Sequence, residues 1–479
     1  MFSRILLCFC VLLCLIELIF AAVVSSPVLI IGAGTAGATV ALELSKQSIP
    51  FILFEATDRV GGRLRREPLG GGLSVELGGM SLQGFRRGVP FHDFVRKFVG
   101  LKAVAADYDD VYFVSNGTLV PDKIADQAWT LSEKALASAY RLQGKYDMDI
   151  RSAVEFSGID IRSPIETAAW RFEIDFEYAV GAEAVSLNGL SPIFAPDAPR
   201  SRDRFVTDQR GYGYAVEVIL QMAGVKDTTR SNDKLRLNTP VDTVRYSEES
   251  AQVVLRNGEI YNGSAVVSTV SAGVLKEALL REPPSASRLN FDPPLRRRKR
   301  LAIAKIVMGD YMKIFVQFKE PVFTDEDPLF LIPLSCDIDG FLKVQNLNKR
   351  GYFPAENIVL VTSTDEYSRE LECESKEKVL RDVLHYLSAA AGKVLSESDV
   401  IGLVASNFRR KPFFKGSFSV RAPSVTDDDI KQFNKPVNSL FFAGEAHRMG
   451  EGLNGYVHGA WDSAVDTTKQ LIEFVANRK

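Results

Sequence analysis

Three glycines near the amino end follow an apolar run and precede a stretch with helical apolar spacing. Gly32, Gly34 and Gly37 come directly after the run Val28 to Ile31. In a loop of this kind the first glycine makes a tight turn, the second leaves room for a pyrophosphate, and the third brings the helix close to the strand. The helix directs its free N–H groups at the anion. The pattern favours a dinucleotide site over a glycine-rich turn in an unrelated α/β domain.

An acidic residue and a second glycine motif make this interpretation more specific. Glu55 ends the next apolar run, near the spacing of roughly 20 residues expected for an acid that binds the ribose hydroxyls. A carboxylate at that place would repel a 2′-phosphate. The run RVGGR, from Arg59 to Arg63, follows almost at once.

With this R-x-G-G-R motif, the chain resembles the flavin-containing amine oxidases. The resemblance extends from Pro27 to about Glu473, and three runs, DQRGY, Y-x-K-I-F and NGYVHGA, are similar to secreted plant-type polyamine oxidases. The segments that carry it are SVELGG (74–79), DQRGYGYAVEVI (208–219), NTPVDTVRY (238–246), SAVVSTVSAGVL (264–275), DYMKIFVQF (310–318), FKGSFS (414–419) and LFFAGEAHRMGEGLNGYVHGAWDSA (440–464).

The resemblance implies FAD as the cofactor and assigns its contacts. Arg63 would neutralise the pyrophosphate, and Gly62 would let the backbone approach the isoalloxazine ring. The backbone of Val241 would meet the adenine, and Glu445 in AGEAH would contact the FAD. The last helix, opened by Tyr456, would aim its N-terminus at the pyrimidine edge of the flavin, where negative charge collects on reduction.

Amine oxidation moves a hydride, or its equivalent, from the carbon beside nitrogen to flavin N5. An ammonium group has no lone pair to stabilise the iminium, so the nitrogen must react as a neutral amine. An apolar aromatic cage disfavours charge on that nitrogen, while carboxylates farther out hold a cationic chain. By resemblance, Tyr456 and Phe418 form the cage. The alternative for each is core packing, because aromatic residues make up 10% of the chain.

Three further candidates come from two alternating runs. Lys313 in YMKIFVQF could face water, but the resemblance implies a buried ammonium, bridged by water to flavin N5, that assists reoxidation by oxygen, with Tyr311 beside it on the same face. Glu177 alternates with Glu173 and Asp175, which would also suit a solvent-facing strand. In polyamine oxidases a D-Y-E at this place, here DFE, contributes a glutamate to the catalytic tunnel.

Gln83 is a departure from the resembled pattern. Plant polyamine oxidases carry an acid or a histidine a few residues after VELG, where this chain has GMSLQGFRRG. Glutamine forms hydrogen bonds but cannot carry charge or take a proton. Arg86 and Arg87 would also repel a polycation if they line the entrance. The change argues against a polyamine substrate but not against flavin chemistry.

The order of the segments predicts how these residues are brought together. We expect an α/β plus α+β fold, in which an FAD-binding Rossmann-like (GR2-type) domain is built from 27–100, 200–275 and 405–479. A substrate-binding domain from 101–199 and 276–404, with a mixed sheet flanked by helices, would be interleaved with it. The length of 479 residues suits two or three domains.

The first 26 residues have the pattern of a secretory signal peptide. Arg4 precedes the apolar run Ile5 to Ile16, and small residues stand near Ser25. Because Glu17 interrupts the pattern, an uncleaved membrane anchor is the alternative. No second stretch reaches the roughly 18 apolar residues of a membrane span. We therefore expect a secreted protein without a stable membrane anchor.

Export would also determine whether the cysteines can form a disulfide and whether the sequon asparagines are glycosylated. After cleavage only Cys336 and Cys373 remain, and in an oxidising compartment they could pair or stay as two free thiols. Asn116 and Asn262 begin glycosylation sequons, which are used only if the chain is secreted.

Composition and charge exclude some function classes. With 46% apolar and 25% charged residues the chain is an ordinary folded protein, and a net charge of −2 argues against a dedicated nucleic-acid binder. The four histidines show no metal-ligand spacing, so we expect no metal. The basic run LRRRKR (295–300) is either a solvated helix face or an adhesion point for polyanionic surfaces.

Together these patterns predict an FAD-dependent amine oxidase. It would oxidise a C–N bond to an imine that hydrolyses to an aldehyde, while O₂ is reduced to hydrogen peroxide. A polyamine is the first expected substrate, followed by another amine and then an L-amino acid, for which no carboxylate-binding arginine is evident. A catalytically silent secreted flavoprotein is the alternative class. The sequence does not specify the oligomeric state.

Overall fold

The strand before the glycine loop lies in the middle of a parallel sheet. The computed structural model describes residues 26–191, 203–280, 285, 287–334 and 340–477. Five of the described strands form this sheet in the order β10-β2-β1-β14-β23, with every neighbouring pair parallel. In that order their bounds are Leu235–Arg236, Phe51–Phe54, Val28–Ile31, Ala265–Ser268 and Leu440–Phe442. The sheet therefore gathers short segments from distant parts of the sequence.

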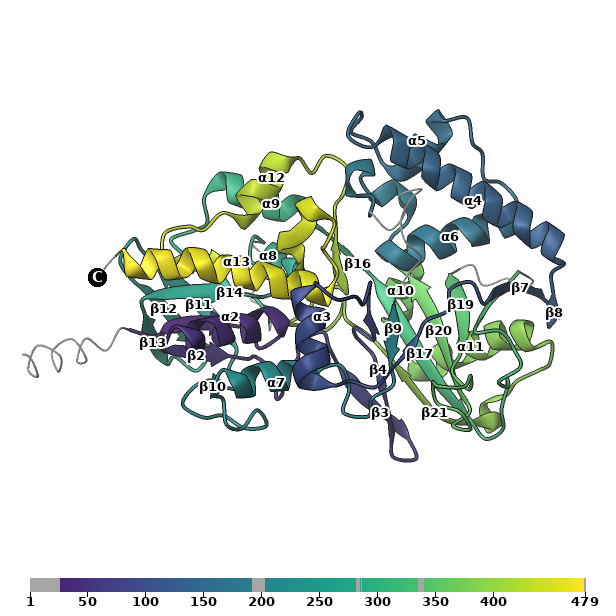
Figure 1. The fold of residues 1–479 in the computed structure, drawn as a ribbon, viewed down its shortest axis with the longest axis horizontal. Coiled ribbons are helices and arrows are strands. Elements are labelled where there is room, and N and C mark those ends of the chain that lie inside the picture. The colour runs from purple at the N-terminus through teal and green to yellow at the C-terminus, as the bar shows by residue number, and fades with distance from the viewer. Residues whose placement is uncertain (1–25, 192–202, 281–284, 286, 335–339, 478–479) are drawn as a thin grey trace, which may run out of the picture.

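Both faces of this sheet are covered, which is why its strands are apolar runs. Neighbouring residues such as Leu29 and Ile30 point to opposite faces and join different apolar clusters. Helices α2, α7 and α13 pack on one face, and Figure 1 shows α2 and α13 side by side. A smaller sheet of order β13-β12-β11-β15 packs on the other. The bounds are Thr35–Lys46, Tyr214–Met222 and Val457–Ala476 for the helices, and Ile260–Gly263, Ala251–Leu255, Val241–Tyr246 and Asn290–Asp292 for the strands.

A mixed sheet of seven described strands forms the other lobe in Figure 1. Its order is β21-β17-β20-β19-β18-β7-β8, and only the β18–β7 pair is parallel. Because side chains alternate, Phe315 of β17 packs toward α4 and α6, whereas Ile314 packs toward α11. The strand bounds in sheet order are Val400–Ala405, Tyr311–Phe318, Ile358–Thr364, Phe341–Asn346, Phe330–Pro333, Val111–Ser115 and Thr118–Leu119, and the helices are Asp122–Leu142, Pro164–Tyr178 and Lys376–Ala391.

Helix α6 corrects one alternative from the sequence. The alternation of Glu173, Asp175 and Glu177 suggested a solvent-facing strand, but these residues are helical. Ser163 and Glu166 form a capping box, and Pro164 occupies the first turn. These signals start a helix, and the acidic alternation does not override them.

Short sheets connect the two lobes. They are β3–β4 (Arg66–Gly70 and Leu73–Glu76), β16–β22 (Val307–Gly309 and Phe418–Val420) and β5-β9-β6 (Ser81–Leu82, Arg204–Val206 and Ala103–Ala105). Other described helices are α3 (Pro90–Phe94), the π-helical turn Val95–Val99, α5 (Ile150–Phe156), α8 (Ala272–Glu277), α9 (Arg297–Lys305), α10 (Asp365–Leu371) and α12 (Asp427–Asn434), and the 3₁₀ turns span Ala182–Ala184, Leu187–Gly189, Glu397–Asp399 and Glu445–Glu451. The predicted fold class is confirmed; the domain boundaries stay a prediction.

The basic run 295–300 begins α9 and serves two purposes. Its arginines are exposed, as expected for a solvated face, but Lys299 is 3% exposed. The Lys299 amine donates to the carbonyls of Phe433 (2.7 Å) and Lys435 (2.8 Å), at the end of α12, and lies 3.8 Å from the centre of the Phe442 ring. Lys299 therefore fastens α9 to α12.

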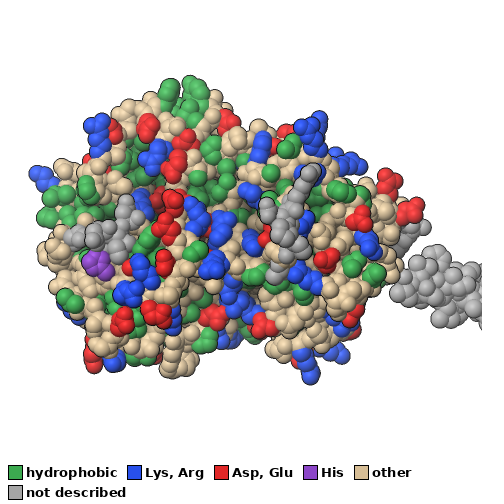
Figure 2. All heavy atoms as spheres, turned by 180° about the vertical axis from the view of Figure 1, so that it is seen from behind, with side chains coloured by type: hydrophobic (Ala, Val, Ile, Leu, Met, Phe, Trp, Pro, Cys, Tyr) green, Lys and Arg blue, Asp and Glu red, His purple; other side chains and the backbone are tan. Residues whose placement is uncertain are grey.

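Several expectations about export fall partly outside the described residues. The proposed signal peptide lies there, except for Ser26, and so does Cys336; Cys373 is exposed, so their pairing stays a prediction. Asn116 and Asn262 are both exposed. Among the helices that the structure describes, none combines the length and apolarity of a membrane span. Figure 2 shows acidic and basic side chains interspersed over the rear face.

Candidate active site

One cavity of about 320 Å³ collects nearly all the residues that the sequence singles out. Its volume is within the usual range for small-molecule sites. The predicted residues that line it are Gly32, Gly34, Glu55, Gly62, Arg63, Gln83, Glu177, Val241, Tyr311, Lys313, Phe418, Glu445 and Tyr456. Gly37 is not among the lining residues; a Cβ on it would lie 1.9 Å from the Gly32 carbonyl oxygen, so it permits the close contact of α2 with the loop.

The glycine loop has the geometry needed for a pyrophosphate. Gly32 adopts a φ of +101°, which side chains disfavour, and Gly34 caps α2 without a side chain that could occupy the helix N-terminus. A Cβ on Gly34 would meet only the Cα of Gly62, at 3.9 Å. The backbone is thus open to a ligand at the positive end of a helix, and this part of the cavity fits a dinucleotide.

Glu55 is held at the edge of this loop. One carboxylate oxygen accepts the N–H of Ala33 (2.8 Å), and the other accepts the N–H and hydroxyl of Thr57 (2.9 and 2.7 Å). A carboxylate has about four acceptor positions, so capacity remains for a ribose hydroxyl. Its place in the cavity fits the predicted ribose contact, which stays a prediction.

The two arginines of the second motif have different surroundings. The Arg59 guanidinium donates to the carbonyls of Val60, Gly62 and Leu64, so it shapes the loop; burial lowers its pKa. Arg63 points into the cavity and forms an ion pair with Glu445, with 2.9 Å between nitrogen and oxygen. The sequence motif alone does not separate these roles, because both residues carry the same charge.

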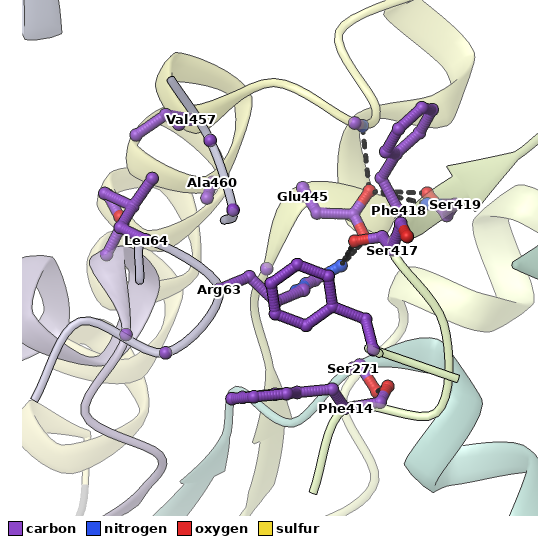
Figure 3. A pocket seen from close by; sticks show the side chains of 18 of the residues that line it. Arg63, Leu64, Ser271, Phe414, Ser417, Phe418, Ser419, Glu445, Val457 and Ala460 are labelled. Atoms are coloured by element: carbon purple, nitrogen blue, oxygen red, sulfur yellow. Dashed lines mark hydrogen bonds and ion pairs between the residues drawn. The ribbon is translucent and has the colours of Figure 1, made fainter. Parts of the chain in front are cut away.

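Glu445 connects several segments around the cavity. Its second oxygen accepts the Ser419 hydroxyl (2.6 Å) and the Gly455 N–H (2.8 Å), as Figure 3 shows around the Arg63 pair. It therefore fixes the segments that carry Phe418 and Tyr456, each one residue from a Glu445 partner. A Cβ on Gly455 would lie 3.2 Å from the Phe418 ring, so the two predicted cage segments pack together closely.

Tyr456 and Glu177 form a half-buried pair in the cavity. The Tyr456 hydroxyl donates to a Glu177 carboxylate oxygen. Burial raises the pKa of Glu177 to about 7, and the hydrogen bond from Tyr456 opposes that rise. Burial and the nearby carboxylate raise the pKa of Tyr456 well above its usual value. A carboxyl group that titrates near neutrality inside an aromatic cavity is suited to a cationic or proton-carrying ligand.

Lys313 is buried rather than facing water. Its amine donates to the Gly78 carbonyl, a partner that the sequence did not indicate, and lies 5.9 Å from the centre of the Tyr311 ring. Burial lowers the pKa of Lys313 to about 7, with Glu76 nearby acting in the opposite direction. Tyr311 in turn lies 6.3 Å from Phe418 between ring centres.

Other residues around the cavity were missed by the sequence reasoning. Asp203 lines it and accepts the Gly84 N–H at 2.7 Å. Behind the cavity wall, the Lys343 amine lies 3.3 Å from the centre of the Phe176 ring and has no hydrogen-bond partner among the described residues. The sequence offers only one sign of this buried amine, a single lysine in the run FLKV (341–344), and that sign does not show what the lysine contacts.

Gln83 and the arginines that follow it in the sequence line two different concave sites. Gln83 lines the cavity, whereas Arg86 and Arg87 line a different hollow and are absent from the described lining of the cavity. Arg86 and Arg87 therefore do not line the cavity itself, and the expectation that they repel a polycation at its entrance stays a prediction. Among the described residues no group of three or more His, Cys, Asp or Glu side chains could hold a metal ion.

Comparison with known proteins agrees with this geometry. A family model described as flavin containing amine oxidoreductase matches residues 35–472. Polyamine oxidase 1 of Zea mays is 28% identical over 476 residues, covering 94% of this chain and 91% of that protein. Polyamine oxidase 6 of Oryza sativa subsp. japonica is 27% identical over 470 residues, covering 93% and 90%. A putrescine oxidase triple mutant, made to redesign cofactor binding, shares the fold with a TM-score of 0.70 at 17% identity, covering 94% of this chain and 99% of that one.

Proposed function

Because the chain belongs to the flavin-containing amine oxidoreductase family, we propose that this FAD-dependent amine oxidase is secreted and acts on a polyamine. The relatives named polyamine oxidases support the substrate class. The observation that carries the substrate proposal is the Glu177 carboxylate, held by Tyr456 in an aromatic cavity that Lys313 also lines. Gln83 in the same cavity keeps a different amine as the second candidate.

The aromatic part of the cavity would select the reactive form of the substrate. When bound, FAD supplies the hydride acceptor and passes the electrons to oxygen. Tyr311, Phe418 and Tyr456 provide rings around the space left for the amine. Low polarity favours its neutral form, which has the lone pair that the reaction needs. Glu177 and Asp203 add two carboxyl groups to the same cavity, where they would attract the ammonium groups of a polyamine chain.

Lys313 would act in the oxygen step. Its buried amine, anchored at the Gly78 carbonyl, has a pKa lowered to about 7, so it can hold or release a proton near neutral pH. A proton donor held in a site shielded from solvent can assist reduction of oxygen to hydrogen peroxide.

The substrate proposal is tested by peroxide release from the FAD-bound protein. The panel contains spermine, spermidine, acetylated polyamines, tyramine and L-amino acids. We expect the highest kcat/KM with a polyamine. A preference for tyramine would select the second candidate, and silence across the panel with FAD bound would support the catalytically silent alternative.

Secretion is tested by expressing the full chain and a variant lacking residues 1–26 in a eukaryotic secretory host. We expect the full chain in the medium, shortened at its amino end and carrying glycans at the exposed Asn116 and Asn262, and the truncated variant inside the cell. Recovery of the full chain in the membrane fraction with its first residues intact would support the membrane anchor instead.

A further inference from the structure

A second hollow lies behind one wall of the active cavity. The short strand β5 separates the two: Ser81 and Gln83 line the cavity, while Leu82 between them lines the hollow. At the edge of β9, Asp203 lines the cavity and Arg204 lines the hollow. Because successive side chains of a strand point to opposite faces, the sheet β5-β9-β6 is the partition.

Four arginines converge on this hollow: Arg86, Arg87, Arg96 and Arg204. Arg96 is paired with Asp93. In the part of the chain that the structure describes, the side chains of the other three form no ion pair or hydrogen bond, and all three are exposed. Guanidinium groups that line one depression without counter-charges repel one another. An oxyanion that accepts hydrogen bonds from two N–H groups of each guanidinium would relieve this repulsion.

The lining of the hollow also includes apolar side chains. Phe85 and Leu101 are half-buried and contribute apolar surface, whereas Leu82 and Val95 are buried, and the volume is about 580 Å³. The Arg96 guanidinium lies 5.0 Å from the centre of the Phe85 ring, so one face of the depression combines an aromatic surface with positive charge. A bare inorganic anion would leave this apolar surface uncovered.

We propose that the hollow binds an organic oxyanion, a phosphate ester or a carboxylate carried on a small apolar group. The anionic head meets Arg86, Arg87 and Arg204, and the apolar body covers Phe85 and Leu101. The site is separate from the FAD site, which lies along the glycine loop. It goes beyond the proposed amine oxidation and does not depend on which amine is the substrate.

The test is calorimetric titration of the FAD-bound full chain, without amine, at constant ionic strength. The probes are phenyl phosphate, benzoate, inorganic phosphate and benzyl alcohol. We expect saturable binding of phenyl phosphate or benzoate, tighter than inorganic phosphate, and no binding of benzyl alcohol. The comparison of the two aromatic anions distinguishes a phosphate site from a carboxylate site. Failure of all probes to bind would overturn the proposal and leave the amine oxidase proposal untouched.

The matched variants are R87Q/R204Q and R297Q/R298Q. Both remove two exposed arginines and the same charge, but the second pair lies on α9. We expect R87Q/R204Q to weaken binding of the aromatic anion at least tenfold and R297Q/R298Q to change it less than twofold. Equal weakening in both, or unchanged affinity in R87Q/R204Q, would overturn the assignment. Flavin absorbance verifies that each variant is folded and loaded.

Discussion

At the scale of single residues, Lys313 has the most specific expected role. Lys313→Met keeps the length and apolar stem but removes the amine that is bound to the Gly78 carbonyl. We expect flavin reoxidation by oxygen to slow about a hundredfold, because a positioned proton donor contributes roughly 10²–10⁴-fold, while anaerobic reduction by amine changes much less. Stopped-flow absorbance separates the two half-reactions.

Lys343→Met is the matched control for this substitution. Lys343 of β19 and Lys313 of β17 lie on either side of Thr362 in β20, with which both residues pair. Its amine lies behind the Phe176 ring rather than at the cavity. The control should reoxidise at nearly the original rate. A similar loss in both variants, or unchanged reoxidation in Lys313→Met, would contradict the role of Lys313.

Glu177 predicts how catalysis depends on pH. Burial raises the pKa of this carboxyl to about 7, so the carboxylate that attracts a substrate ammonium forms as the pH rises through about 7. We expect kcat/KM for a polyamine to rise over this range. Tyr456→Phe removes a hydrogen bond that favours the carboxylate, so the acidic limb should move to higher pH.

Glu177→Gln provides the control for that assignment. It keeps the shape of the side chain but cannot ionise, so the rise of kcat/KM centred near pH 7 should disappear, leaving the rise that follows deprotonation of the substrate amine, and kcat/KM should fall about tenfold to a hundredfold, in the range of losing one close charge pair. The measurement is kcat/KM for spermidine between pH 5 and pH 9 (about two units on each side of neutrality). An acidic limb that persists unchanged in Glu177→Gln would assign it to another group.

Residue types and spacing show where the sequence is informative. The glycine loop and Glu55 could be placed because each requires a fixed local geometry. The Gly78 carbonyl could not, since every residue has a backbone oxygen and nothing in the sequence shows which one meets Lys313. Asp203 and Lys343 were missed for a related reason: a single charge in a loop or an apolar run does not show what lies across from it.

At the scale of elements, Lys299 links two helices that are distant in sequence. Its amine donates to two carbonyls at the end of α12, which would otherwise be short of donors. Lys299→Met should lower the free energy of unfolding by about 1–3 kcal/mol, the cost of leaving buried acceptors unsatisfied. Urea unfolding measures the change.

Arg298→Met is the control, because Arg298 is the exposed residue that precedes Lys299 on α9. Its effect should stay within about 0.5 kcal/mol. Equal stability of the two variants would show that the Lys299 contacts contribute nothing beyond those of a surface residue.

Element boundaries also show why the alternation around Glu177 was ambiguous. A period of two in charged residues is compatible with a strand. Two other features favour a helix: the capping box of Ser163 and Glu166, and the spacing of the buried residues Ala169, Trp170 and Phe172. The acidic residues then distribute around α6, and only Glu177, near its end, reaches the cavity.

At the scale of the whole molecule, the interleaving of segments creates the active cavity. The parallel sheet uses strands from the two ends and the middle of the chain, and the Arg63–Glu445 ion pair connects the first of these segments with the last. Family resemblance predicted this order of segments. The second hollow could not be predicted, since its four arginines come from three separate elements and resemble ordinary surface charge in the sequence.

If the second hollow binds an anion and the active cavity binds a polyamine, the charge in the hollow should affect the affinity for the amine. This prediction depends on both proposals. Three unpaired guanidinium groups, and Arg96 with its partner Asp93, stand behind the wall that carries Gln83 and Asp203, so their net positive charge opposes a cationic substrate. Saturating phenyl phosphate should neutralise part of this charge and lower KM for spermidine about twofold to fivefold, with kcat nearly unchanged, because screening leaves only a fraction of the interaction. R87Q/R204Q should start from a lower KM and lose the response, whereas R297Q/R298Q should keep it. Peroxide release at constant ionic strength measures these constants, and a KM that does not respond while phenyl phosphate is bound would mean that the partition insulates the cavity from the arginines.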